Sequence, residues 1–100
     1  MIYLVATLTY KPGTLDEFLD AAKTCIAATR QEEGCISYDL HQSLTDENTL
    51  VFVERWTDRA ALEGHFNADH FKVWREAGSP YFTSRKIEII DIDEDKVETL

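Results

Sequence analysis

The chain has 100 residues, 44% of them hydrophobic, which is enough for one compact domain with a modest core. It carries 19 acidic and 10 basic residues, and the net charge of −9 argues against binding to nucleic acid or to an anionic membrane surface. No apolar run could span a bilayer and the N-terminus does not resemble a signal peptide, so we expect a cytoplasmic protein without membrane contact.

The first half of the chain predicts a strand, a helix and a second strand. Residues 2–11 alternate between two faces, which is typical of a strand. Thr14 and Glu17 have the spacing of a capping box, and the apolar spacing that follows predicts a helix from Leu15 to about Glu32. Residues 35–42 alternate again and predict the second strand.

The second half predicts a hairpin partner, a broken helical region and a last strand. The predicted elements are strand 49–56, helical segments 59–66 and 70–77, and strand 85–92, followed by a short acidic tail over 93–100. Thr57 or Asp58 is expected to cap the first helical segment, and residues 67–69 to interrupt the helical region.

The short loop between strands 35–42 and 49–56 predicts an antiparallel hairpin. In the expected register Tyr38 lies opposite Glu54, Leu40 opposite Phe52, and Ile36 opposite Trp56. A slip of one residue would invert the faces.

The predicted order is β-α-β-β-α-β, which with an antiparallel sheet is the ferredoxin-like α+β arrangement, in a single domain over residues 1–100. One sheet face would take the helices. The other would present apolar and threonine side chains, namely Tyr3, Val5, Thr7, Val51 and Val53. Because this face is too apolar for water, we expect a second copy to cover it in a homodimer.

Several segments together resemble a known family. They are Tyr10-Lys11-Pro12-Gly13, the run from Glu32 to His41, Glu54-Arg55-Trp56, Leu62-Glu63-Gly64-His65 and His70-Phe71. They resemble the antibiotic biosynthesis monooxygenase superfamily, and most of all its small stand-alone members described as quinol monooxygenases. The resemblance covers essentially the whole chain. It implies a dimeric α+β barrel in which each protomer keeps its own pocket between sheet and helices.

Characterised members of that family include cofactor-free oxygenases of quinols and polyphenols, haem-degrading enzymes, and an isomerase of a phosphorylated diketone. Cofactor-free oxygenation needs a base with a pKa near neutrality, a dry aromatic cavity and donors for the oxyanion. His65 and His70 are the natural candidates for the base. On one continuous helix they would point about 140° apart, but the break at residues 67–69 would let both face a common cavity.

Glu54 lies between two aromatic residues on the strand face that also carries Tyr38. A carboxylate on such a face is costly to bury unless it has a hydrogen-bond partner or a functional role, so Glu54 is a candidate base or orienting group. Tyr38 is a candidate donor of a hydrogen bond to a substrate oxygen. Further aromatic side chains would form the walls for a flat ligand. These are Trp56, Phe66, Phe71, Trp74 and Phe82.

The other activities of the family fit less well. Haem-degrading members resemble one another in having an asparagine on the first strand and a tryptophan and a histidine in the helical region. At the corresponding positions this chain has Ala6, His65 and Arg75, so haem degradation is not expected. The isomerase resembles this chain in the spacing of its histidines and in the strand carboxylate, and its phosphorylated substrate would need a basic contact. The available cations are Lys72, Arg75, Arg85 and Lys86.

No metal site is expected, because the two histidines are not an i, i+4 pair and Cys25 and Cys35 form no C-x-x-C motif. The sequence therefore favours an oxygenase of quinol or polyphenol type, acting on a small aromatic substrate with dioxygen and without flavin, haem or metal. The isomerase reaction and a non-catalytic small-molecule binding protein remain alternatives.

Overall fold

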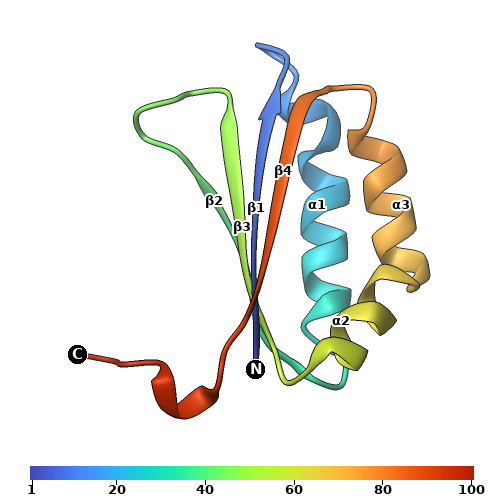
Figure 1. The fold of residues 1–100 in the computed structure, drawn as a ribbon. Helices are drawn as coiled ribbons and strands as arrows, with labels where there is room; N and C mark the ends of the chain where they lie inside the picture. The colour runs from blue at the N-terminus through green and yellow to red at the C-terminus, as the bar shows by residue number, and fades with distance from the viewer.

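The computed structural model describes residues 1–100. The elements are β1 (Ile2–Tyr10), α1 (Leu15–Thr29), β2 (Cys35–Gln42), β3 (Thr49–Trp56), α2 (Arg59–Phe66), α3 (Asp69–Gly78), β4 (Phe82–Asp91) and the short 3-10 helix η1 (Glu94–Lys96). The strands form one antiparallel sheet in the order β2-β3-β1-β4, and the three α-helices lie on one side of it (Figure 1). The predicted ferredoxin-like α+β fold is confirmed. No helix is long and apolar enough to cross a membrane.

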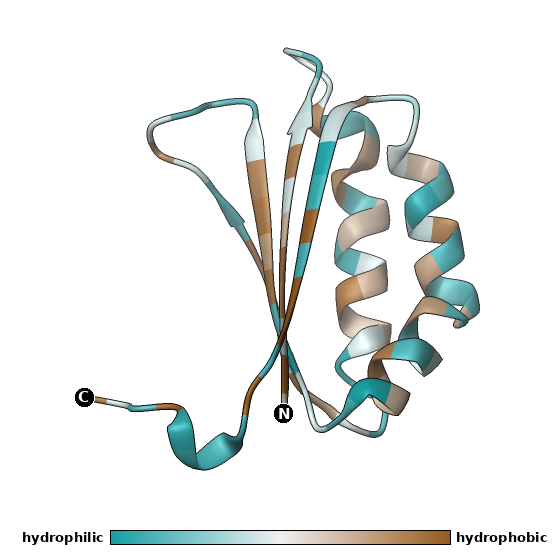
Figure 2. Ribbon diagram, viewed as in Figure 1, coloured by the Kyte–Doolittle hydropathy of each residue, from teal (hydrophilic) through white to brown (hydrophobic).

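The core lies between the sheet and the helices, and β1 runs through its centre. Every second residue of β1, from Ile2 to Tyr10, is buried on the helix side. The helices contribute buried side chains such as Phe18, Leu62 and Trp74. Hydrophobic and hydrophilic segments alternate along the helices (Figure 2). The period-2 burial along β1 confirms the alternation in the sequence.

The opposite sheet face carries no α-helix (Figure 1). The five residues predicted for it, namely Tyr3, Val5, Thr7, Val51 and Val53, are all half-buried and pair across the β1–β3 register. This part of the prediction is confirmed.

The β2–β3 hairpin has the predicted register for most of its length. Tyr38 lies opposite Glu54, as expected. The expectation that Ile36 lies opposite Trp56 is wrong, because a bulge leaves Ile36 unpaired and brings Cys35 opposite Trp56. The extra residue turns Ile36 outward, where it is 45% exposed.

Two predicted helix features are wrong at α1. The helix ends at Thr29 and not near Glu32, because the amides of Gln31 and Glu32 bond three residues back and tighten the chain into turns. Thr14 makes no capping bond, since its hydroxyl donates to the Lys11 carbonyl instead. Glu32 is thereby placed in the connection between α1 and β2.

The other element ends follow the sequence more closely. Of the two predicted caps, Thr57 and Asp58, it is Asp58 that caps α2, because its Oδ1 accepts a hydrogen bond of 2.8 Å from the Ala61 amide. α3 extends one residue beyond the prediction at each end. β4 begins at Phe82, three residues before the predicted start, because Phe82 pairs with Tyr10 across a bulge.

Candidate functional site

A cavity of about 360 Å³ lies on the helix side of the sheet. Its lining is mostly apolar, from β1 (Leu4, Ala6, Leu8), from Phe52 and Ile87, and from the aromatic residues Phe66, Phe71, Trp74 and Phe82. Tyr38 also lines it, and the three charged lining residues are Glu54, Arg75 and Arg85. A cavity of this size and character suits a small, flat, largely apolar molecule with few polar groups.

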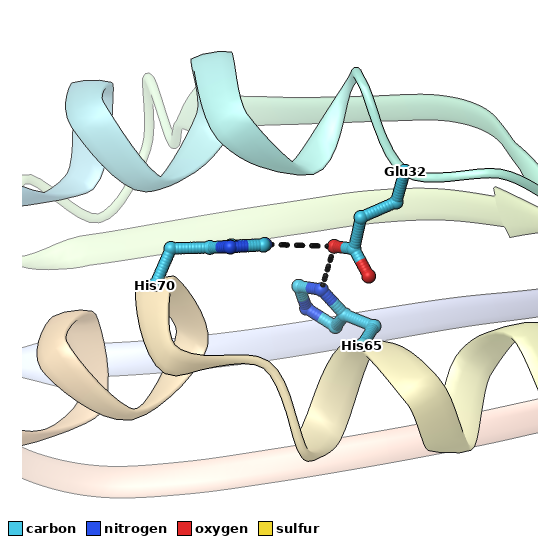
Figure 3. Close-up of side chains that lie close together, drawn as sticks. All are labelled: Glu32, His65 and His70. Atoms are coloured by element: carbon cyan, nitrogen blue, oxygen red, sulfur yellow. Dashed lines mark hydrogen bonds and ion pairs between the residues drawn. The ribbon is translucent and has the colours of Figure 1, made fainter.

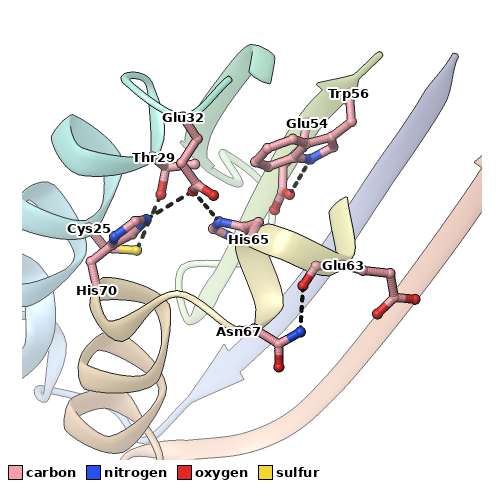
Figure 4. Close-up of polar contacts among 9 residues, drawn as sticks. All are labelled: Cys25, Thr29, Glu32, Glu54, Trp56, Glu63, His65, Asn67 and His70. Carbon is pink, nitrogen blue, oxygen red and sulfur yellow. Dashed lines mark hydrogen bonds and ion pairs between the residues drawn. The ribbon is translucent and has the colours of Figure 1, made fainter. Parts of the chain in front are cut away.

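Glu54 is the acidic group of this cavity. It occupies a helix-facing position of β3 and is 4% exposed. Its Oε1 accepts a hydrogen bond of 3.0 Å from the Trp56 indole N–H (Figure 4). Burial raises the pKa of Glu54 from its ordinary 4.5 to about 7, although the indole bond opposes the rise. The carboxyl group can therefore both take up and release a proton near neutrality.

Tyr38 lies across the hairpin from Glu54, as the register predicts. It is 2% exposed, and burial, reinforced by the charge of Glu54, raises the pKa of its phenol well above the ordinary value. The hydroxyl group thus stays protonated at neutral pH. It is suited to donate a hydrogen bond, and unsuited to act as a base.

His65 and His70 converge on Glu32 (Figure 3). One carboxylate oxygen, Oε2, lies 2.7 Å from His65 Nδ1 and 2.9 Å from His70 Nε2. The break between α2 and α3 does bring the two histidines together, as expected. They meet on a carboxylate from the α1–β2 connection, however, and neither histidine lines the cavity.

His65 is fully buried, and its two ring nitrogens differ. Nδ1 lies beside the Glu32 carboxylate, which fixes the proton there as a donor. Nε2 is buried without a hydrogen-bond partner. Burial lowers the pKa of His65, so the ring is neutral at pH 7 and Nε2 carries a free lone pair.

Three aromatic rings lie closest to His65, and two of them, Phe71 and Tyr38, also line the cavity. Its ring centroid lies 4.8 Å from Phe71, 4.9 Å from Trp56 and 5.2 Å from Tyr38. Because Trp56 in turn donates to Glu54, the histidine is one side chain removed from the cavity carboxylate (Figure 4).

Glu32 is the site residue that the sequence reasoning missed as a functional group. Its only signal was its place in the segment that carries the family resemblance. The potential ligand atoms of Glu32, His65 and His70 lie within 4.8 Å of one another, so these three residues could also hold a metal ion.

The predicted aromatic walls are partly where the sequence placed them. Phe66, Phe71, Trp74 and Phe82 all line the cavity. Trp56 does not, because it is fully buried beneath the lining and turns its indole to Glu54.

Three of the four named cations gather at one place. Lys72, Arg75 and Arg85 line a polar cavity of about 520 Å³ with Glu76 and Ser79. Arg75 and Arg85 also line the apolar cavity, so the two spaces adjoin. Lys86 is absent from both, and its ammonium lies 3.8 Å from Glu88.

The fold and this site can be compared with known proteins. Residues 1–77 match the family model described as antibiotic biosynthesis monooxygenase. The protein named "Putative monooxygenase YcnE" from Bacillus subtilis is 40% identical over 72 residues, which are 72% of this chain and 76% of that protein. An uncharacterized Synechocystis protein is 35% identical over 88% of this chain, which spans only 59% of that relative.

Solved structures agree with these matches. A structure from Caulobacter crescentus, described as a putative antibiotic biosynthesis monooxygenase, superposes with a TM-score of 0.88 at 32% identity and covers 93% of this chain and 90% of that one. The structure of Rv0793 from Mycobacterium tuberculosis superposes with a TM-score of 0.86 at 25% identity, over 96% of this chain and 98% of that one. The chain therefore belongs to the antibiotic biosynthesis monooxygenase family.

Proposed function

We propose that this protein is a cofactor-free monooxygenase that adds one atom of dioxygen to a quinol or polyphenol-like substrate. The observation that carries the proposal is Glu54, a carboxyl group 4% exposed in a mostly apolar cavity, whose pKa burial raises to about 7. A base with such a pKa can deprotonate an aromatic hydroxyl near neutral pH.

After the substrate hydroxyl loses its proton, the reaction with dioxygen needs few further groups from the protein. Glu54 takes the proton from the substrate hydroxyl, and the Tyr38 phenol donates a hydrogen bond to the oxyanion. The electron-rich anion then passes one electron to dioxygen, and the resulting radical pair joins in a carbon–oxygen bond. Loss of water from the hydroperoxide completes the reaction, so a quinol and dioxygen give a hydroxyquinone and water.

In this proposal the histidines act on Glu54 indirectly, through the Trp56 side chain. Glu32 holds His65 in the tautomer whose Nε2 lone pair is free, and His65 packs on Trp56, the hydrogen-bond donor to Glu54. Burial keeps His65 neutral, so it acts on Glu54 through the position of the Trp56 indole. Glu54 takes the role of base that the sequence suggests for His65 and His70, and the two histidines become positioning residues.

Oxygen uptake with reduced naphthoquinones tests the proposal. The wild type should consume dioxygen above the spontaneous rate, and the rate should rise with pH through about 7 as Glu54 loses its proton. Removing a general base typically costs about 100-fold or more, so Glu54→Gln should lose nearly all the enzymatic rate. His65→Ala should lower the rate less, and should shift the pH midpoint.

The matched control is Glu33→Gln, which removes one exposed carboxylate outside the cavity and should leave uptake unchanged. No uptake above the spontaneous rate, or equal rates in wild type, E54Q and H65A, would contradict the proposal. Turnover of a phosphorylated diketone without dioxygen would establish the isomerase reaction instead. Ligand-induced stabilisation with neither activity would indicate a binding protein.

We also propose that residues 1–100 form one domain of a cytoplasmic homodimer. Support comes from the sheet face opposite the helices, where apolar side chains such as Val5, Val51 and Val53 lie half-buried and no element of the chain covers them. A second copy would remove this face from water. Sizing chromatography at micromolar concentration should give the mass of a dimer, and a monomer would contradict it.

A further inference from the structure

The cavity has charges of opposite sign at its two ends. Glu54 pairs with Leu4 on β1, whereas Arg85 pairs with Leu8 on the other side of the same strand. Four residues of strand correspond to about 13 Å, and the two strands that flank β1 are about 10 Å apart. The backbone positions of the acid and the base are thus about 16 Å apart, a span that a two-ring aromatic anion bridges together with the reach of the two side chains.

The basic end is unusual for so acidic a chain. Lys72, Arg75 and Arg85 share one polar cavity with a single carboxylate, Glu76, and none of the three cations lies within ion-pair distance of an acidic side chain. Elsewhere on the chain the cations either pair with a carboxylate, as Arg30 and Arg59 do, or share no cavity with another cation. A positive patch of this kind attracts an anion locally, against the general repulsion of a net charge of −9.

Arg75 connects the two spaces. Its guanidinium lies over the Phe71 ring, with 5.8 Å from Cζ to the ring centroid, and both residues line the apolar cavity. A flat ligand beside Phe71 would therefore reach the guanidinium groups at one end without leaving the cavity. Guanidinium groups bind carboxylate, sulfonate and phosphate groups through paired N–H donors.

We propose that the substrate is an amphiphilic aromatic anion, with its reacting hydroxyl at Glu54 and an anionic substituent held by Arg75 and Arg85, with Lys72 nearby. The assignment of the hydroxyl to Glu54 rests on the proposed function. The assignment of the anionic group rests on the basic end of the cavity alone.

A matched pair of unreactive ligands tests this inference. 2-Naphthol and 6-hydroxy-2-naphthoate share the ring system and the hydroxyl, and differ in a carboxylate at the far end. Titration calorimetry should show the naphthoate binding to the wild type about 10-fold or more tightly than the naphthol, since a hydrogen-bonded charge pair is worth about that much. Added salt should reduce the difference.

The variants Arg75→Gln and Arg85→Gln should each weaken naphthoate binding and leave naphthol binding within about twofold, and the double variant should abolish the preference. The control Lys23→Gln removes an exposed cation of α1 outside both cavities and should change neither affinity. Equal affinity of the wild type for the two ligands, or an undiminished preference in the double variant, would overturn the inference. So would inorganic phosphate binding as tightly as the naphthoate, since the aromatic body would then contribute nothing.

This result is independent of the proposed reaction because binding is measured without turnover. If the wild type prefers the naphthoate but consumes no dioxygen, the result supports the anion site and contradicts the proposed oxygenase function. If the wild type oxidises quinols but binds both ligands equally, the result supports the oxygenase function and contradicts the anion site.

Discussion

Replacing Glu54 by Gln should make the protein more stable at neutral pH, although it removes the proposed base. The carboxyl group is 4% exposed, and burial raises its pKa from 4.5 to about 7. Gln keeps the size of the side chain and an oxygen that can accept the Trp56 indole bond. The substitution therefore removes chiefly the cost of a buried charge.

The sign and size follow from that pKa. Between pH 4.5 and about 7 the unfolded chain has already lost the Glu54 proton while the folded chain still holds it. The wild type therefore loses stability as pH rises through this window. At about 1.4 kcal/mol for each pKa unit, the loss approaches about 3 kcal/mol by pH 8. E54Q should not lose it.

Urea denaturation of wild type and E54Q at several pH values from 5 to 8 measures this difference directly. The free energy of unfolding of E54Q relative to wild type should rise by about 2–3 kcal/mol across the range. His65 is present in both proteins, so its own titration largely cancels. Glu33→Gln, at an exposed position, should follow the wild-type curve. Parallel curves for E54Q and wild type would refute the idea that Glu54 is buried with a raised pKa.

Three further outcomes follow from the geometry. Glu32→Gln should lower the free energy of unfolding by about 1.5–3 kcal/mol, because charge-assisted bonds to His65 and His70 are lost, and an unchanged urea midpoint would contradict this. Gly34→Ala should lower the melting temperature more than Gly13→Ala. Both glycines have positive φ, but only at Gly34 would a Cβ lie 2.5 Å from a side chain of α2. Equal losses in the two variants would argue against that packing. A chelator should leave oxygen uptake unchanged, since hydrogen bonds already join the Glu32 cluster; loss with recovery on adding zinc would assign that cluster to a metal instead.

The sequence predicts the parts of this structure that depend on local patterns. The period-2 alternation of β1 predicted its buried face, and the short hairpin loop predicted that Tyr38 lies opposite Glu54. Thr57 and Asp58, both residue types that cap helices, predicted the start of α2, and Asp58 makes the capping bond. In each case the determining residues are close together in the chain.

The missed features depend on contacts between distant segments or on one extra residue. Glu32 belongs to the site only because α1 ends early and its connection to β2 passes the α2–α3 break, more than 30 residues away along the chain. The bulge at Ile36 cannot be predicted from the alternation of apolar and polar residues along residues 35–42. The grouping of Arg75 and Arg85 likewise needs α3 and β4 to be placed against each other.

The central claim is that Glu54 is the group that meets the reacting hydroxyl. A crystal of the protein soaked with 2-naphthol tests it most directly. The claim predicts the ring inside the apolar cavity, beside Phe71, with its oxygen at hydrogen-bond distance, about 2.6–3.2 Å, from the Glu54 carboxyl group. A naphthol whose oxygen lies instead against His70 and Glu32, or a ring bound outside this cavity, would contradict it.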